Sequence, residues 1–406
     1  MKHWRGYVAA LAVPSALAPW TAAHAQSSVT LYGIIDTGVA YQSNATTLGS
    51  GKAGHSVVNM INGAWAGSRF GLKGAEDLGG GTQAIFQLEE GFNSATGAQA
   101  TSGLAFNRQA FVGMTNPVYG TLTAGRQYTA YYTMLAPYSP ASKLTGFYGA
   151  HPGDIDSLDT VYRANNSLVY TSPRYHGLTA SASYALGGVA GSFDAGSTWS
   201  AGLQYIGGPL GIAVGFQRIN NSTPGGGAWG SSSTASNAGS EPGVSAINVG
   251  YQTAKAQQRF AVTGGYQITP AWDVSVSYSN VQYVPGQNSS FANLAIFNTG
   301  GLVVHYRPAM QWDLAAGYSY TLATRSNGIT SAARYQQFNM SEYYALSKRT
   351  GLYGLQGYQR ATGRTLGSSG AGAIVDATAS IGDGVNGAPS SGRSQAVAAV
   401  GIVHRF

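Results

Sequence analysis

Polar and apolar residues alternate with a period of two along most of this chain, and this alternation limits the fold more than any other feature. Between residues 82 and 89, Thr, Ala, Phe and Leu alternate with Gln and Glu, and residues 30–39 and 395–406 follow the same pattern. Successive side chains of a β-strand point to opposite faces, so the pattern predicts strands with one apolar and one polar face. No segment keeps a helical period over three turns. The chain is therefore predicted to be all-β.

Short turns and long connections alternate between the predicted strands. Seven short turns are predicted at residues 77–81, 116–120, 172–177, 207–211, 269–272, 307–311 and 347–351. The longer connections include residues 43–64, 128–160, 220–243, 326–333 and 362–392. Seven short turns and eight long loops require sixteen strands, and this alternation is typical of a transmembrane antiparallel β-barrel of the outer membrane. Residues 245–253 look like a strand but would make the count odd, so we place them inside the fifth long loop, with a small hairpin above the barrel as the alternative.

The composition agrees with a barrel in a membrane. Only 9% of the residues are charged, against roughly 25% in average soluble proteins, while Gly contributes 58 residues and Tyr 26. A closed barrel leaves no unpaired backbone groups in hydrocarbon, and tyrosines suit its interfacial belts. The formal charge of +7 comes from scattered Lys and Arg, with no basic run, which argues against nucleic acid as a partner. Cys is absent, so no disulfide can form.

The N-terminus has the pattern of a secretory signal. Two basic residues precede a mostly apolar stretch over residues 6–20, and Ala23-His24-Ala25 supplies the small residues of a cleavage site. The apolar stretch is interrupted by two prolines, and it is shorter than the roughly 20 residues of a membrane anchor. We therefore expect a signal peptide over residues 1–25 and an exported β-barrel domain over residues 26–406.

Several sequence blocks carry a family resemblance. They are Ser28-Val29-Thr30-Leu31-Tyr32-Gly33, Ser68-Arg69-Phe70-Gly71-Leu72-Lys73-Gly74, Asn107-Arg108-Gln109-Ala110-Phe111-Val112-Gly113, Tyr119-Gly120-Thr121-Leu122-Thr123-Ala124-Gly125-Arg126-Gln127, Tyr162-Arg163-Ala164-Asn165-Asn166-Ser167, Leu346-Ser347-Lys348-Arg349-Thr350 and Val403-His404-Arg405-Phe406. In this order, the blocks resemble the trimeric general porins of Gram-negative bacteria, and in particular those of beta-proteobacteria.

The resemblance implies an architecture and a set of partners. It implies a homotrimer of sixteen-stranded barrels in outer-membrane lipid and lipopolysaccharide, each passing small hydrophilic solutes and ions by passive diffusion. A third loop folds inward to narrow each pore, and residues 128–160 occupy its position. The terminal Phe406 resembles the signal by which the barrel-assembly machinery recognises its clients; an interfacial aromatic is the other interpretation.

The resemblance also implies a cluster of cations on the pore wall. Carried over by motif, the wall cluster is Arg69, Arg108 and Arg163, with Arg126 and Lys73 as neighbours. Strand parity supports two of these positions, because Arg69 and Lys73 fall on the same face. Lumen-facing charges at the narrowest point of a channel set its selectivity.

In such porins, acidic groups on the inward loop face the arginines. The candidates are Asp154, Asp156 and Asp159 in the third loop, with Glu89 and Asp36 inward by strand parity. The Pro-Glu-Phe-Gly-Gly run of enteric porins is missing from this loop. Arginines without a full set of opposing carboxylates predict a preference for anions.

Other function classes remain as alternatives. Aromatic residues crowd the third loop, as in a channel selective for sugars or organic acids, and the long Gly/Ser-rich loops suit an adhesin. No HExxH pair, P-loop or nucleophile elbow in a strand-to-helix context is present, so we expect no enzyme, metal site or cofactor. A Ser/His/Asp site assembled across strands is the one enzymatic arrangement that spacing leaves open.

Overall fold

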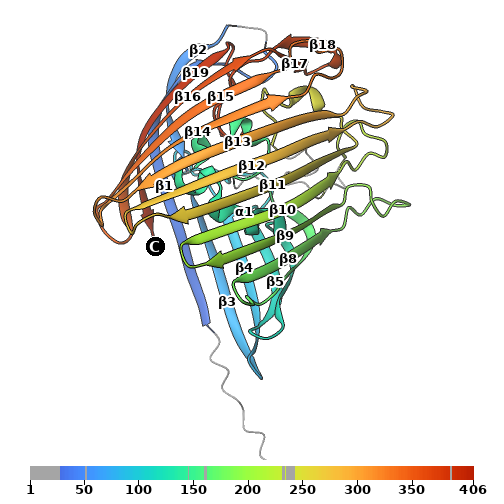
Figure 1. Cartoon of the computed structure of the whole chain (residues 1–406). Helices are drawn as coiled ribbons and strands as arrows, with labels where there is room; N and C mark the ends of the chain where they lie inside the picture. Colours follow the sequence, from blue (N-terminus) through green and yellow to red (C-terminus); the bar gives the residue numbers. More distant parts are fainter. Residues whose placement is uncertain are drawn as a thin grey trace, which may run out of the picture.

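The computed structural model describes residues 28–50, 53–144, 146–159, 162–230, 234, 243–384 and 386–406. The predicted signal peptide lies outside the described residues. Within them, the chain forms a closed antiparallel β-barrel whose strands wrap around a set of short internal helices (Figure 1). The all-β prediction is confirmed. No helix of the described part is long and apolar enough to cross a membrane.

The barrel strands pair in sequence order, and the last closes on the first. They are β1 (Ser28–Ala45), β2 (His55–Asn62), β3 (Arg69–Gly79), β4 (Thr82–Gly91), β5 (Gln109–Asn116), β6 (Gly120–Gln127), β7 (Ala164–Thr171), β8 (Leu178–Ala185), β9 (Thr198–Gly207), β10 (Leu210–Asn220), β11 (Ala256–Gln267), β12 (Trp272–Val284), β13 (Ala295–Tyr306), β14 (Trp312–Ala323), β15 (Arg334–Ala345), β16 (Thr350–Thr362) and β19 (Ser394–Arg405). Closure is made by β19 and β1, where Val400 lies opposite Val39.

Two of these segments occupy one position in the ring. The first half of β1 pairs with β3 and its second half with β2, so β2 and β3 together form one interrupted strand. The described barrel therefore has sixteen strand positions from seventeen segments. The predicted loop over residues 43–64 was wrong in part, because β1 runs on to Ala45 and β2 fills His55–Asn62. Residues 43–54 are mostly small or polar, which suggests a loop, although β2 carries exposed apolar side chains such as Val58 and Met60.

Asp36 holds the segment between β2 and β3 inside the barrel. Its carboxylate accepts hydrogen bonds of 2.7 Å from the backbone N–H groups of Trp65 and Ala66, and another of 2.7 Å from the hydroxyl of Tyr353. Asp36 is fully buried, and Trp65 stacks on Tyr343. Asp36 points inward as parity predicted, where it fixes the chain that turns into the lumen.

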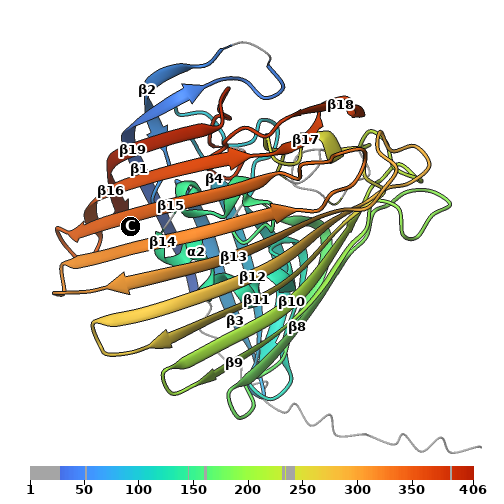
Figure 2. The same cartoon turned by 45° about the horizontal axis from the view of Figure 1, so that its top comes forward.

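All seven predicted short turns join consecutive strands at one end of the barrel, and the long loops lie at the other. Residues 245–253 lie between β10 and β11 inside the fifth long loop, as placed, but they contain a 3-10 turn, η4 (Val249–Tyr251), and no hairpin. The small hairpin above the rim belongs instead to the last loop and is formed by β17 (Arg364–Gly367) and β18 (Gly370–Asp376) (Figure 2). It packs on η4, with Leu366 and Tyr251 in a shared apolar core.

Burial follows the predicted strand faces. Leu31, Val39 and Val400 are 60%, 45% and 65% exposed on the outer face, where lipid would cover them. Inward-facing polar residues such as Gln217 and Gln359 are buried within the lumen. Apolar outer and polar inner faces are the pattern of a membrane barrel.

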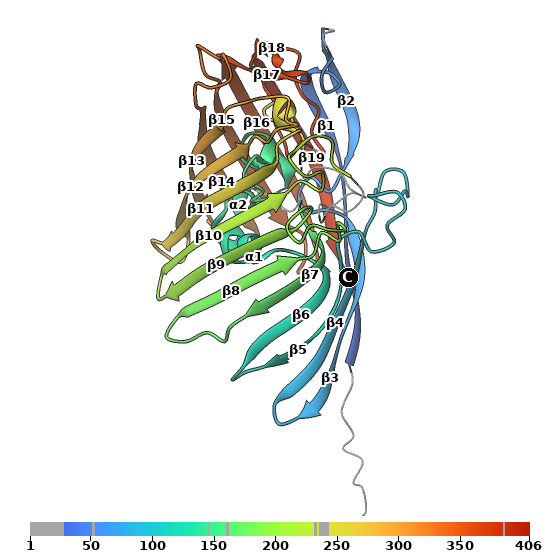
Figure 3. The same cartoon turned by 90° about the vertical axis from the view of Figure 1, so that its right-hand side faces the viewer.

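The third long loop lies inside the barrel. We call residues 128–163 loop 3; its described part contains α1 (Ala130–Leu135), η1 (Ala136–Tyr138), α2 (Pro140–Leu144), η2 (Phe147–Gly149) and η3 (Pro152–Asp154). Figure 3 shows α1 and α2 within the ring of strands. The predicted inward fold of this loop is confirmed.

Candidate functional site

Loop 3 is attached to one half of the barrel wall. Gln204 of β9 donates a hydrogen bond of 2.9 Å to the carbonyl of Met134, and Thr263 of β11 donates one of 2.9 Å to the carbonyl of Leu135. Inward-facing amides and hydroxyls of the wall thus donate hydrogen bonds to backbone carbonyls of the loop. Without these donors, the carbonyls would need water as a partner.

The later part of loop 3 is attached in the same way to β15. Gln337 donates to the carbonyl of Ala150 and Asn339 to the carbonyl of Tyr148, both at 2.7 Å. The loop therefore lies against the β9–β16 side of the lumen. The opposite side of the lumen, beside β2, β3, β4 and β6, is left open.

A Ser–His–Asp arrangement lies at this attachment. Nδ1 of His151 lies 2.6 Å from Asp156 Oδ2, and its Nε2 lies 3.1 Å from Ser277 Oγ. Ser279 donates to the same Asp156 oxygen at 2.7 Å. The order resembles a catalytic triad, but the cavity beside His151 measures about 10 Å³, which is room for about one water molecule. The arrangement fastens loop 3 to β12.

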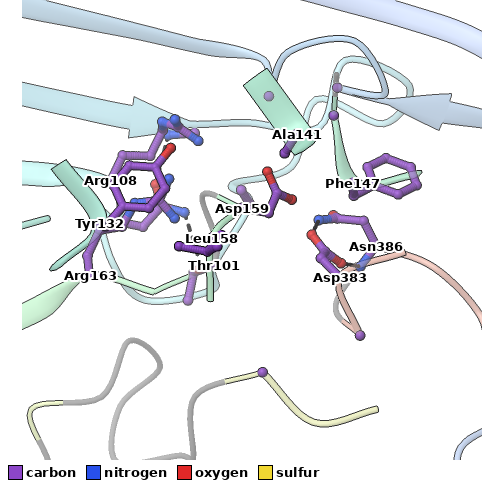
Figure 4. Close-up of a pocket in the computed structure, with 18 of the residues that line it drawn as sticks. Thr101, Arg108, Tyr132, Ala141, Phe147, Leu158, Asp159, Arg163, Asp383 and Asn386 are labelled. Carbon is purple, nitrogen blue, oxygen red and sulfur yellow. Dashed lines mark hydrogen bonds between the residues drawn. The ribbon is translucent and has the colours of Figure 1, made fainter. Parts of the chain in front are cut away.

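On the other side of loop 3 lies a cavity of about 860 Å³. Among its described lining residues, four are arginines and two are aspartates: Arg69, Arg108, Arg126, Arg163, Asp159 and Asp383. In Figure 4, Arg108 and Arg163 lie at one side, Asp383 at the other and Asp159 between them. The three arginines of the predicted wall cluster and the neighbouring Arg126 are thus brought together with one of the three predicted third-loop aspartates.

Glu89 is the counter-charge at the base of the arginine cluster. Its Oε1 lies 2.7 Å from Nε of Arg108 and its Oε2 lies 3.7 Å from Nε of Arg69. The same carboxylate accepts a hydrogen bond of 2.9 Å from the hydroxyl of Tyr32. Since β3 and β4 pair directly, with Gly71 opposite Glu89, strand register sets this arrangement.

Tyr128 joins two of the arginines. Its hydroxyl accepts hydrogen bonds from Nη2 of Arg108 at 3.2 Å and from Nη2 of Arg163 at 2.9 Å. The ring of Tyr128 stacks on Tyr132 at 4.8 Å. Burial alone would raise the pKa of Tyr128, but the positive charges of Arg108 and Arg163 hold it below its usual value.

Arg126 is held by amide oxygens. Its Nε donates to the carbonyl of Asn107 at 2.7 Å, and its Nη1 donates to Oδ1 of Asn165 at 2.5 Å. These bonds fix the guanidinium at the edge of the cavity, where it lines the same wall as Arg163.

Three of the residues predicted for the site do not line the cavity. Lys73 lies farther along β3 towards the short-turn end, with its ammonium 5.4 Å from the ring centre of Tyr32. Asp156 is hydrogen-bonded to His151. Asp154 is buried and accepts the backbone N–H of Asp159 at 3.0 Å; burial, with Asp159 and Asp156 nearby, raises its pKa well above the usual value.

Sequence reasoning missed Asp383. This residue belongs to the last long loop, residues 363–393, which we call loop 8. One carboxylate oxygen accepts the backbone N–H of Asn386 at 2.7 Å and the other accepts its side-chain amide at 2.5 Å. Asp383 lies between Gly382 and Gly384. An acidic residue flanked by glycines in a long loop was the one sequence feature that could have pointed to it.

The comparisons with known proteins agree with this geometry. A family described as Gram-negative porin matches residues 8–364. The chain belongs to the Gram-negative porin family. The porin is 38% identical over 224 residues to an outer membrane porin protein of Bordetella pertussis, and 34% identical over 209 residues to outer membrane porin protein 32 of Delftia acidovorans. Its place is the outer membrane of a Gram-negative bacterium.

The alignments with both relatives are partial. They cover 50% and 49% of this porin and 56% of each relative, so the chain spans about half the length of the relatives it matches. The barrel also resembles the anion-selective porin from Comamonas acidovorans, with a TM-score of 0.67 and 24% identity, over 94% of this chain and 100% of the other. At that identity the likeness shows the fold.

Proposed function

We propose that this porin is a diffusion channel for small hydrophilic solutes and ions, with a preference for anions. The observation that carries the proposal is the cavity beside loop 3, whose described lining holds four arginines and two aspartates. A surplus of fixed positive charge in a narrow, low-dielectric passage raises the local concentration of anions. The wall cluster is Arg69, Arg108 and Arg163, with Arg126 beside it in the same lining and Asp159 facing them.

The proposed assembly is a homotrimer in outer-membrane lipid and lipopolysaccharide. Membership of the porin family supports this proposal. The exposed apolar side chains around the barrel agree with contact to lipid or to a second copy of the chain. Two measurements test the channel: step conductance in planar bilayers, and swelling of porin-containing liposomes in small sugars and salts. Stepwise conductance with swelling supports the proposal; closed bilayers and absent swelling contradict it.

A sugar-selective channel is the second candidate, because the aromatic residues Tyr132 and Phe147 line the cavity. Other aromatic residues of loop 3 pack elsewhere: Tyr131 is fully buried and bonded to the carbonyl of Asp156, and Tyr138 packs over Gly211. Saturable block of the ion current by a sugar would favour this candidate over a general channel.

We also propose that Phe406 is the assembly signal. Its backbone exchanges two hydrogen bonds of 3.1 Å with Gly33, which pins the chain end to β1, and its ring is 42% exposed on the outer face. Replacement by Ala should lower the amount of folded porin in the outer membrane while leaving refolding of purified chain in detergent intact. Equal losses in both would assign Phe406 to the barrel's own stability instead.

A further inference from the structure

Two arginines lie on the outer face of the barrel at its long-loop end. Arg334 begins β15 and shares a strand face with Phe338, which is 47% exposed on the outside. Arg360 lies near the end of β16 and shares a face with Tyr358, which is 49% exposed on the outside. Arg360 pairs with Gln336, two residues along β15 from Arg334. The arginines are therefore diagonal neighbours on adjacent strands, about 7–8 Å apart, and both point away from the lumen.

Two arginines of loop 8 join this pair. The N–H of Arg364 donates a hydrogen bond of 2.8 Å to the carbonyl of Ser331, just before β15. The carbonyl of Arg393 accepts one of 2.7 Å from the N–H of Ala361, near the end of β16. We call the four residues the rim patch: Arg334, Arg360, Arg364 and Arg393. Within the described part of the chain, the ion pairs of the rim patch all go to Asp376, at 3.9 Å from Arg364 and 3.0 Å from Arg393. Four arginines thus share one acid.

An apolar surface adjoins the rim patch on the membrane side. Phe338 and Tyr358 lie directly opposite each other on β15 and β16, and Leu322 of β14 lies opposite Arg334. All three side chains are exposed on the outer face. The long loops of an outer-membrane barrel face the cell exterior. The rim patch therefore lies at the level where the headgroups of the outer leaflet meet the acyl chains.

We propose that the rim patch binds a glycolipid carrying two or more phosphate groups, whose acyl chains lie against Phe338 and Tyr358. The inference rests on the proposed function, because it gives a site to the lipid association proposed there. Guanidinium groups bind phosphate oxygens through paired hydrogen bonds. The apolar side chains directly below the arginines favour a lipid over a soluble polyanion, which would leave them uncovered.

The test is the double variant Arg334→Gln/Arg360→Gln of the full-length porin in detergent. The probe is diphosphoryl lipid A, and the lipid bound at each concentration is counted by native mass spectrometry. Because each arginine near a membrane surface contributes about 1 kcal/mol to binding an anionic lipid, the double variant should bind roughly tenfold or more weakly than wild type. Equal binding by the two proteins would overturn the proposal.

Two further probes separate the phosphates from the acyl chains. Lipid A without phosphates should bind wild type weakly and to the same extent as the double variant; wild-type binding as tight as that of the diphosphoryl form would overturn the proposal. Inorganic triphosphate, equimolar with the lipid, should not displace it. Full displacement would show that the rim patch binds a soluble polyanion, and would also overturn the proposal.

The matched control is the double variant Arg174→Gln/Arg349→Gln. It removes two exposed arginines from the short-turn end of the barrel, and it should bind the lipid as wild type does. A loss equal to that of the rim variant would mean that net charge alone attracts the lipid, which contradicts a site.

Conductance separates this inference from the proposed function. Arg334 and Arg360 face outward, so the rim variant should keep the step conductance and reversal potential of wild type. A wild type that conducts but shows no preference for the diphosphoryl lipid overturns the rim patch and leaves the channel standing. A wild type that binds the lipid through the rim patch but conducts no ions overturns the channel instead.

Discussion

The hydroxyl of Tyr128 lies 2.9 Å from Nη2 of Arg163, so a single hydrogen bond joins the first residue of loop 3 to the last. The same hydroxyl also accepts from Arg108, which precedes β5. One side chain of loop 3 therefore holds two of the four arginines that line the cavity. We therefore expect the ion selectivity of this porin to depend on the position of loop 3.

Tyr128→Phe tests that coupling through pH. Ionisation of Tyr128 would place a negative charge between two arginines, and since Arg108 and Arg163 lower its pKa, this occurs below the ordinary tyrosine value of about 10. The anion preference of the wild type should therefore fall as the pH rises towards that value. The phenylalanine variant should keep its preference constant over the same range, as measured by reversal potentials. An identical alkaline fall in both proteins would remove Tyr128 from the account.

The variants Arg69→Ala and Arg163→Ala test the wall cluster. Loss of either charge should lower the chloride-to-potassium permeability ratio by roughly two- to fivefold, from the Coulomb energy of one charge near the path. Arg174→Ala is the control, because Arg174 is exposed in the turn between β7 and β8, away from the cavity lining. Unchanged selectivity in both wall variants would refute the assignment of the cluster.

Glu89→Gln separates charge from stability. The substitution removes the counter-charge of Arg108 and Arg69, so the anion preference should rise. The barrel should also lose stability, because breaking a buried ion pair costs about 3–5 kcal/mol. Thermal unfolding in detergent measures the second effect, with the exposed Glu76→Gln on β3 as control. A variant as stable as wild type would show that Glu89 contributes charge alone.

Gly301→Ala tests the attachment of loop 3 at β13. A methyl group at Gly301 would collide with Nε2 of His151 and with Oγ of Ser277, whereas one at the neighbouring Gly300 meets open space. Overpacking of this kind costs about 1–3 kcal/mol. The variant should therefore unfold at a lower temperature and show noisier single-channel currents, while Gly300→Ala behaves as wild type. Quiet currents in both would mean that the His151 contact does not hold the loop.

The wall of the barrel was predictable because its causes are local. Outward residues such as Leu31 and Val400 are apolar, and the residues next to them along the strand are small or polar. The chain reverses at tight turns such as residues 77–81. Each of these features can be recognised in the local sequence. The prediction was wrong in part over residues 43–64, where small and polar residues suggested one loop but β1 runs on to Ala45 and β2 fills His55–Asn62.

Loop side chains were less predictable, because parity applies only to strands. Glu89 and Arg69 could be placed inward from their strands, whereas the aspartates of loop 3 were placed by resemblance. Asp156 contacts His151 at the barrel wall, and Asp383 of loop 8 lines the cavity. Both positions depend on packing between loops that are distant in sequence.

The most direct test of the central claim is the reversal potential of the wild-type porin in a KCl gradient across a planar bilayer. The account predicts step conductance with a reversal potential of the anion-selective sign, because the lining arginines outnumber the lining aspartates in the described cavity. A reversal potential of the cation-selective sign would contradict it.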